Sequence, residues 1–166
     1  MSVYIIFGLP GAGKTYVGWV FEKYFKYFFY DGDDELSEEM KQAIASKTVF
    51  TNQMRDAFFE NLINKIDGLT KEHEKLVIAQ TFIKEKYRMD LMRQIPQAKF
   101  LLVQADKEIR ELRLTKRNEY PLDLEYARKM VHNFEEPEIP PVEINNDEEG
   151  IENLKEQIGR ILQNQS

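Results

Sequence analysis

The chain has 166 residues, of which 42% are hydrophobic and 31% are charged, so it has the composition of a folded globular protein and not of a disordered one. It contains no cysteine, which excludes a disulfide scaffold and thiolate metal sites. The formal net charge is −6 and the basic residues do not cluster, which argues against nucleic acid as a partner.

The length fits one domain, and we expect residues 1–166 to form it. No apolar run reaches the roughly 18 residues that a membrane-spanning helix needs. An apolar strand pattern begins at Val3, which leaves no space for a signal peptide. Together these features fit a cytoplasmic protein without a membrane partner.

Short apolar runs alternate with stretches of helical periodicity along the chain. In chain order we expect a strand at Val3–Phe7, a helix from about Gly13 to Tyr24, a strand at Tyr27–Tyr30, helices at Leu36–Ala45 and from Thr51 to about Ile66, a strand at Lys75–Ala79, a helix at Lys84–Arg93, a strand at Phe100–Val103, helices from Asp106 to about Thr115 and at Leu124–Phe134, a strand near Val142–Ile144 and a helix at Glu148–Leu162. This alternation predicts an α/β fold in which a parallel sheet is covered by helices on both faces.

Local signals set several of the expected helix ends. Thr51 and Asp106 stand at expected N-caps, because their side-chain oxygens can accept hydrogen bonds from free backbone N–H groups. Asp67-Gly68 is expected to end the helix that begins after Thr51. We expect Trp19 and the aromatic segment Tyr24–Tyr30 to pack in the core, since aromatic side chains bury large apolar areas.

The most informative motif lies directly after the first expected strand. Gly8 to Thr15 reads G-x-x-x-x-G-K-T, which is the pattern of a phosphate-binding loop, or P-loop. Glycines allow the backbone N–H groups of such a loop to point at phosphate oxygens, and the following helix adds its positive N-terminal dipole. Lys14 can reach the terminal phosphates and the Thr15 hydroxyl can ligate Mg²⁺. The alternative, a glycine-rich turn without a ligand, is disfavoured because the strand and the helix that the motif requires both flank it.

A pair of carboxylates follows the second expected strand. Asp31 and Asp33 are separated by Gly32, so in an extended turn their side chains point in similar directions. Beside a P-loop, Asp31 can hold Mg²⁺ through a water molecule while Asp33 orients an attacking hydroxyl. Taken alone, this segment also fits an ordinary turn before a helix, where Asp and Gly are common.

The pairing of Gly8–Thr15 with Asp31-Gly32-Asp33 resembles the gluconokinase and shikimate kinase branch of the small P-loop kinases. Shorter stretches resemble gluconokinases as well: Lys84 with Tyr87-Arg88, Thr51 with Arg55, and Arg113-Leu114 with Arg117 and Phe134–Pro137. The resemblance implies a three-layer α/β/α P-loop kinase fold with a five-stranded parallel sheet and a helical lid at about residues 116–123. It also implies transfer of the ATP γ-phosphate to a small hydroxylated molecule.

The acceptor side departs from that resemblance. Where gluconokinases continue with His-Pro and a nearby Asn, this chain has Asp34–Glu39, and the glycine-rich substrate loop of shikimate kinases is absent. These acidic residues could favour the start of a helix, or they could repel an anionic acceptor. The sequence therefore supports the phosphate half of the resemblance and leaves the acceptor open.

The candidate site residues follow from the motif and the resemblance. Nucleotide binding is expected at Gly8, Leu9, Pro10, Gly11, Ala12, Gly13, Lys14, Thr15, Tyr16 and Arg113; Mg²⁺ binding at Thr15 and Asp31; catalysis at Lys14, Asp33 and Arg117; and acceptor binding at Asp33, Arg55 and Arg88. Arg117 could close over the transferring phosphate, Arg113 could stack on adenine or contact phosphate, and Arg55 could clamp a carboxylate or phosphate. Each of these arginines also has a plainer interpretation as a solvated charge or a surface ion pair.

The sequence therefore predicts an ATP- and Mg²⁺-dependent kinase that acts on a hydroxyl of a small metabolite, as a monomer or a homodimer. One alternative keeps the chemistry but takes a nucleotide or a nucleic-acid 5′-hydroxyl as acceptor. Another is a module that binds ATP without turnover.

Overall fold

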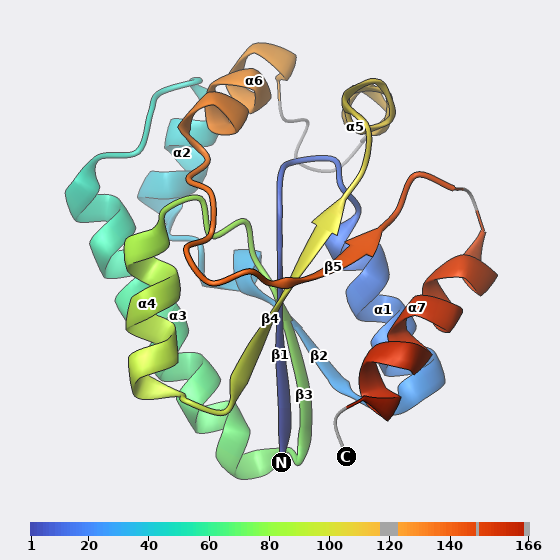
Figure 1. Ribbon diagram of the computed structural model, residues 1–166. Coiled ribbons are helices and arrows are strands. Elements are labelled where there is room, and N and C mark those ends of the chain that lie inside the picture. Colours follow the sequence, from blue (N-terminus) through green and yellow to red (C-terminus); the bar gives the residue numbers. More distant parts are fainter. Residues whose placement is uncertain (117–122, 149, 165–166) are drawn as a thin grey trace.

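The protein is built around one parallel sheet. The computed structural model describes residues 1–116, 123–148 and 150–164. The strands are β1 (Ser2–Phe7), β2 (Phe28–Asp31), β3 (Lys75–Ala79), β4 (Ala98–Gln104) and β5 (Val142–Asn145). They lie in the order β2-β3-β1-β4-β5, and all four neighbouring pairs are parallel (Figure 1). The expected five-stranded parallel sheet is confirmed.

Helices cover both faces of the sheet and its carboxyl edge. In chain order they are α1 (Lys14–Phe25), the 3₁₀ turn η1 (Gly32–Glu35), α2 (Glu38–Ala45), α3 (Asn52–Glu72), α4 (Glu85–Gln94), α5 (Lys107–Thr115), α6 (Leu124–Asn133) and α7 (Ile151–Gln163). Helices α3 and α4 lie on one face and α1 and α7 on the other, whereas α2, α5 and α6 lie beyond the carboxyl ends of the strands (Figure 1).

The central strand β1 shows why the sheet is buried on both sides. Its side chains alternate, so that Val3, Ile5 and Phe7 enter the core under α3 and α4, while Tyr4 and Ile6 enter the core under α1 and α7. A strand covered on both faces needs apolar residues at its buried positions, and β1 has them at Val3–Phe7. The two cores fix the position of the loop that follows Phe7.

Helix α3 is longer than the sequence predicts. Thr51 is its N-cap, as expected, with the hydroxyl oxygen accepting a hydrogen bond from the Met54 N–H at 3.1 Å. However, the helix does not end at Gly68 but continues to Glu72. Leu69 and Thr70 are buried, so packing of this last turn outweighs the helix penalty of about 1 kcal/mol for one glycine.

Two further expectations are only partly confirmed. Asp106 is the N-cap residue of α5, as expected, but its side chain makes no capping hydrogen bond. In the aromatic segment Tyr27 is buried, and Phe25, Phe29 and Tyr30 pack against the two cores. Trp19, Tyr24 and Phe28, in contrast, are exposed on α1 and on the edge strand β2. Trp19 instead stacks on Tyr16 at a ring distance of 5.7 Å.

The longest helix, α3, has too many charged residues to be a membrane span. No helix in the described part of the chain combines the length and the apolar character that crossing a membrane requires.

Candidate active site

The P-loop lies between β1 and α1 and depends on its glycines. Gly8, Gly11 and Gly13 have φ angles of +148°, +84° and +92°, which other residues rarely adopt. A Cβ atom at Gly11 would overlap the backbone oxygen of Arg110 in α5, and one at Gly13 would overlap the side-chain amide of Asn146. The loop is therefore held against α5 and the segment after β5 at a distance that only glycine permits.

Two polar side chains brace this loop from behind. The Asn146 amide donates a hydrogen bond to the Ala12 carbonyl at 2.9 Å. The Arg113 guanidinium donates to the Gly11 and Ala12 carbonyls at 3.1 and 3.2 Å and to the Asn146 carbonyl at 2.5 Å. These bonds fix the orientation of the peptide planes at the centre of the motif.

Arg113 has a different role from the one expected, and Asn146 is a further residue of the site. Arg113 was expected to contact adenine or phosphate, but its hydrogen bonds to described residues all go to backbone carbonyls, and it does not line the cavity in front of the loop. Asn146 was not predicted. The available signal was its place directly after β5, where a polar residue follows a strand at the carboxyl edge of the sheet.

A cavity opens in front of the loop, and both predicted carboxylates line it. Its lining includes Gly13, Lys14 and Thr15 from the loop and α1, together with Asp31 and Asp33. Asp31 ends β2 and accepts a hydrogen bond from the Asp33 N–H at 2.9 Å. The structure thus brings the two sequence signals, the P-loop and the pair of carboxylates, into one cavity.

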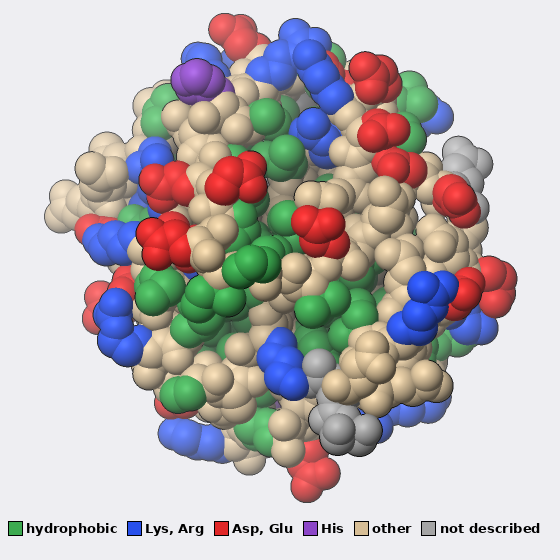
Figure 2. Space-filling view, in the orientation of Figure 1, with side chains coloured by type: hydrophobic (Ala, Val, Ile, Leu, Met, Phe, Trp, Pro, Cys, Tyr) green, Lys and Arg blue, Asp and Glu red, His purple; other side chains and the backbone are tan. Residues whose placement is uncertain are grey.

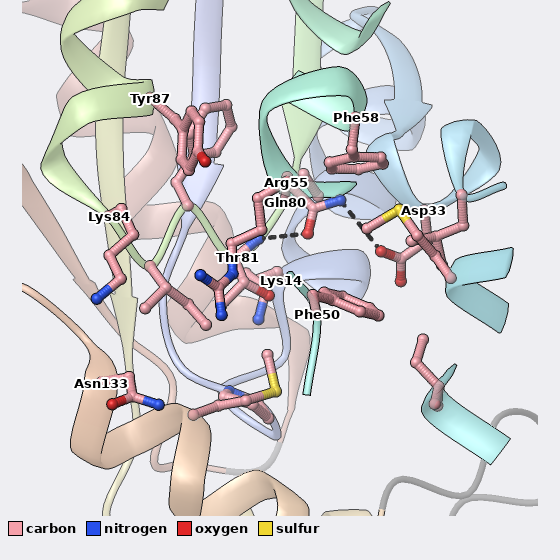
Figure 3. Close-up of a pocket in the computed structure, with 18 of the residues that line it drawn as sticks. Lys14, Asp33, Phe50, Arg55, Phe58, Gln80, Thr81, Lys84, Tyr87 and Asn133 are labelled. Carbon is pink, nitrogen blue, oxygen red and sulfur yellow. Dashed lines mark hydrogen bonds between the residues drawn. The ribbon is translucent and has the colours of Figure 1, made fainter. Parts of the chain in front are cut away.

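Gln80 orients Asp33 within this cavity. Its side-chain amide donates a hydrogen bond to Asp33 Oδ1 at 3.1 Å, and its oxygen accepts one from the Thr81 N–H at 2.8 Å (Figure 3). Gly32 permits this approach, because a Cβ there would lie 2.8 Å from the Ala79 carbonyl oxygen. Gln80 follows directly after β3, the same signal that Asn146 gives after β5.

The electrostatics of the site favour a bound cation beside Asp31. Burial raises the pKa of the Asp31 carboxyl, and the nearby charges of Asp33 and Asp34 raise it further, against the lowering effects of the Asp33 N–H and of Lys14. Thr15 supplies a hydroxyl to the same cavity. Among the described residues, no group of three or more His, Cys, Asp or Glu side chains is arranged so that it could hold a metal ion. Such a sparse set of oxygen ligands suits Mg²⁺, which is commonly held by one or two protein groups together with phosphate oxygens and water.

Arg55 and Arg88, both expected at the acceptor, have different surroundings. Arg55 comes from the first turn of α3 and lines the cavity (Figure 3). Its guanidinium donates a hydrogen bond to Asn52 at 3.0 Å, and within the described ranges it forms no ion pair. It is thus placed to meet a ligand.

Arg88 is placed differently: it is buried and does not line the cavity. It donates hydrogen bonds to the Phe82 and Ile83 carbonyls at 2.8 and 3.1 Å and pairs with Glu85 at 2.6 Å. The geometry therefore does not support the expected acceptor contact. Arg88 instead holds the Gln80–Lys84 segment, in which Phe82 has a φ of +47°.

The remaining expected residues divide into two groups. The Tyr16 side chain is exposed beside Trp19 and does not line the cavity. Arg117 and most of the expected lid at 116–123 lie outside the described residues. Leu9 and Pro10 belong to the loop, with the Leu9 carbonyl accepting a hydrogen bond from Lys14 Nζ at 3.0 Å.

Comparison with known proteins agrees with this arrangement. A family model described as an AAA domain matches residues 3–137. The chain belongs to this AAA domain family. None of the curated proteins matches the chain.

Several solved structures that are similar to this AAA domain are kinases. A sugar kinase from Janibacter sp. HTCC2649 shares 19% identity at a TM-score of 0.81, covering 98% of this chain and 93% of its own. A gluconokinase from Sinorhizobium meliloti 1021 shares 16% sequence identity at a TM-score of 0.79, and the match covers 98% of this chain and 94% of the gluconokinase. A shikimate kinase from Aquifex aeolicus vf5 shares 18% sequence identity at a TM-score of 0.61, and the match covers 98% of this chain and 97% of the shikimate kinase. The expected P-loop kinase fold is confirmed, and at these identities the likeness concerns the fold alone.

Proposed function

We propose that the protein is an ATP-dependent phosphotransferase that moves the γ-phosphate to a hydroxyl of a small molecule. One observation carries this proposal: the P-loop and Asp33 open onto the same cavity, and Gln80 holds Asp33 in place. A site for phosphate and a fixed carboxylate for the attacking hydroxyl are the parts that phosphoryl transfer requires. The kinase fold of the similar structures supports the same reaction class.

Each residue has a role in this reaction. Lys14 and the backbone N–H groups of the P-loop bind the β- and γ-phosphates of ATP. Thr15 and, through water, Asp31 would hold Mg²⁺, which would supply positive charge to neutralise the phosphate oxygens. Asp33 accepts a hydrogen bond from the acceptor hydroxyl, orients it and takes its proton as the new O–P bond forms and ADP leaves. From its position in the sequence, Arg117 remains our candidate for neutralising charge on the transferring phosphate.

A nucleic-acid acceptor is less well supported. The net charge is −6, and Figure 2 shows Lys and Arg side chains interspersed with Asp and Glu on the face it presents. Binding to nucleic acid usually needs a basic stripe or patch to neutralise phosphates. A module that binds ATP without turnover would have no use for a carboxylate held beside the P-loop, so it is also disfavoured.

The test of this function is ADP formation measured with and without acceptors. A panel of hydroxy acids, polyols and nucleosides is expected to contain compounds that raise ADP release above the rate with water alone. In calorimetry, Lys14→Ala is expected to weaken ATP binding by about tenfold or more, because a charge-assisted phosphate contact is lost. Lys71→Ala, on the exposed end of α3, is the matched control. Equal ATP affinity in the wild type and Lys14→Ala would overturn the assignment.

A further inference from the structure

The acceptor side of the cavity is walled by apolar side chains. Met40 and Ile44 come from α2, Val49 and Phe50 from the segment before α3, and Phe58 from α3. Figure 3 shows the rings of Phe50 and Phe58 facing the space next to Asp33. None of these side chains carries a hydrogen-bonding group, so this wall offers an acceptor contact area but no polar partner.

Asp33 and Arg55 line the same cavity as this wall, and they carry opposite charges. Asp33 is fixed by Gln80, and Arg55 comes from α3, as Phe58 does. Other polar side chains, among them Thr81, Lys84, Tyr87 and Asn133, also line the cavity. Arg55 forms no ion pair with a described residue, although it stands beside Phe58 and the buried Tyr126. A guanidinium left without an anion in such surroundings is costly when water is displaced, so an anionic ligand group stabilises it.

The charges of the cavity agree with an anionic ligand. Its described lining contains four basic side chains, Lys14, Arg55, Lys84 and Lys129, and two acidic ones, Asp31 and Asp33. The acidic residues that could have repelled an anion do not line it. Glu35 accepts a hydrogen bond from the Tyr30 hydroxyl, and Glu38 pairs with Lys41 on the exposed side of α2.

We infer that the acceptor is an amphipathic molecule with an apolar, ring-bearing body, a reacting hydroxyl beside Asp33 and an anionic group beside Arg55. The position of the acceptor hydroxyl rests on the proposed function, whereas the apolar character of the acceptor body rests on the cavity wall. A polyol chain fits the wall poorly, because its hydroxyls would lose hydrogen bonds to water and find no partners on Met40, Ile44, Val49, Phe50 or Phe58. An aromatic ring fits it well, since it gains apolar contact and offset or edge-on packing with Phe50 and Phe58.

Binding of two fluorescent probes tests the shape and charge of this site without requiring turnover. Anilinonaphthalene sulfonate and N-phenylnaphthylamine have the same aromatic rings, but only the first is an anion. We expect both to bind with a rise in fluorescence, and the sulfonate to bind about tenfold more tightly because it meets Arg55. Arg55→Gln is expected to remove this difference, whereas Arg93→Gln, on an exposed arginine outside the cavity, is expected to keep it.

Apolar variants test the wall itself. Phe50→Ser and Val49→Ser are expected to weaken both probes severalfold, because each removes apolar contact area. Val49 is 51% exposed, so its replacement has little effect on folding and the test does not depend on Phe50 alone. Ile139→Ser, an exposed apolar residue outside the cavity, is the control. If the probes fail to bind, or bind with affinities that Arg55 and Val49 do not affect, the inference is wrong.

A turnover comparison separates this inference from the proposed function. Phenyllactate and gluconate are both hydroxy acids, and their bodies are aromatic and polyhydroxylated, respectively. We expect kcat/KM for phenyllactate to exceed that for gluconate by about tenfold or more. Faster transfer to gluconate would confirm a kinase and overturn the inferred acceptor class. If the wild-type protein does not bind ATP, the proposed function is wrong. The fluorescent-probe titrations would then still show whether the cavity binds an apolar anion.

Discussion

The two halves of the cavity are built in different ways. The phosphate half is backbone: glycines with positive φ, and carbonyls held by Arg113 and Asn146. The acceptor half is side chain: an apolar wall from α2 and α3 with Asp33 and Arg55 beside it. A backbone site depends on a contiguous motif, whereas a side-chain site can change its ligand by single substitutions. This difference explains why the P-loop follows a known pattern and the acceptor side does not.

Removing the carboxylate at the junction of the two halves is expected to have the largest effect. Asp33→Asn keeps the size of the side chain but cannot take a proton, so kcat should fall by roughly a hundredfold or more. ATP affinity should stay unchanged, because no nucleotide contact is lost. Steady-state kinetics and calorimetry measure the two quantities. Asp34→Asn is the matched control, since Asp34 is exposed and does not line the cavity. Turnover of Asp33→Asn at the wild-type rate would make Asp33 a turn residue.

A substitution in the backbone of the phosphate half should act mainly on the nucleotide. In Gly11→Ala the new Cβ meets the Arg110 carbonyl and the φ of +84° is strained, so we expect a loss of about 1–3 kcal/mol of stability. ATP affinity is expected to fall by about tenfold or more. Gly159→Ala in α7 has free space around it and should instead raise the melting temperature slightly. Thermal unfolding and calorimetry would distinguish these outcomes, and similar behaviour of the two variants would contradict the glycine argument.

Removing one side chain of the brace behind the loop should have a smaller effect than Gly11→Ala, and it should again weaken nucleotide binding and not binding at the acceptor side. Asn146→Ala removes one of the two donors to the buried Ala12 carbonyl, the one at 2.9 Å, while Arg113 still donates to it at 3.2 Å, so we expect a cost of about 0.5–1.5 kcal/mol. We expect ATP affinity to fall by roughly tenfold and the affinity of anilinonaphthalene sulfonate to stay the same. Asn61→Ala on the exposed face of α3 serves as control. Equal losses for both ligands would show that the two halves are coupled.

The smallest expected effect is the pH dependence of metal binding. Because burial raises the pKa of Asp31 above its usual 3.8, its carboxyl takes up a proton at a higher pH than an ordinary aspartate. The Mg²⁺ concentration for half activity should therefore rise as the pH falls toward this pKa, and Asp31→Asn should abolish that rise. For folding the direction is opposite: the buried charge lowers stability above the folded pKa, and this cost disappears as the pH falls through it, so stability rises. NMR titrations of the Asp31 carboxyl, with and without Mg²⁺, measure its pKa directly. A pKa at or below 3.8 in the absence of Mg²⁺ would contradict this account.

The sequence predicts the phosphate half because its signals are local. The P-loop needs a strand, a glycine pattern and a helix in succession, and all three are readable in the chain. The sequence also predicts the position of each strand to within two residues. For the inner strands β1, β3 and β4 the reason is that strands covered on both faces read as apolar runs. The end of α3 was missed because the packing of Leu69, a tertiary effect, overrides the local signal of Gly68.

Residues whose role depends on distant neighbours could not be assigned from the sequence. Arg88 and Arg55 have the same side chain, and both lie in the first turn of a helix. However, Arg88 is buried with its guanidinium over the rings of Phe7 and Phe134, whereas Arg55 lines the cavity. Only the fold distinguishes them. The same holds for the apolar wall, whose members read as ordinary core residues until α2 and α3 are seen to leave a space beside Asp33.

The brace at Ala12 also has a consequence for the order in which the protein is assembled. One of its two donors, Asn146, is 134 residues later in the chain, so a ribosome exposes the complete phosphate-binding motif long before it has made this part of the brace. A nascent chain that ends before β5 carries the motif but has no partner for the Ala12 carbonyl from that strand. The nucleotide site is therefore finished only when β5 has joined the edge of the sheet beside β4, as one of the last contacts of the sheet that the growing chain can make.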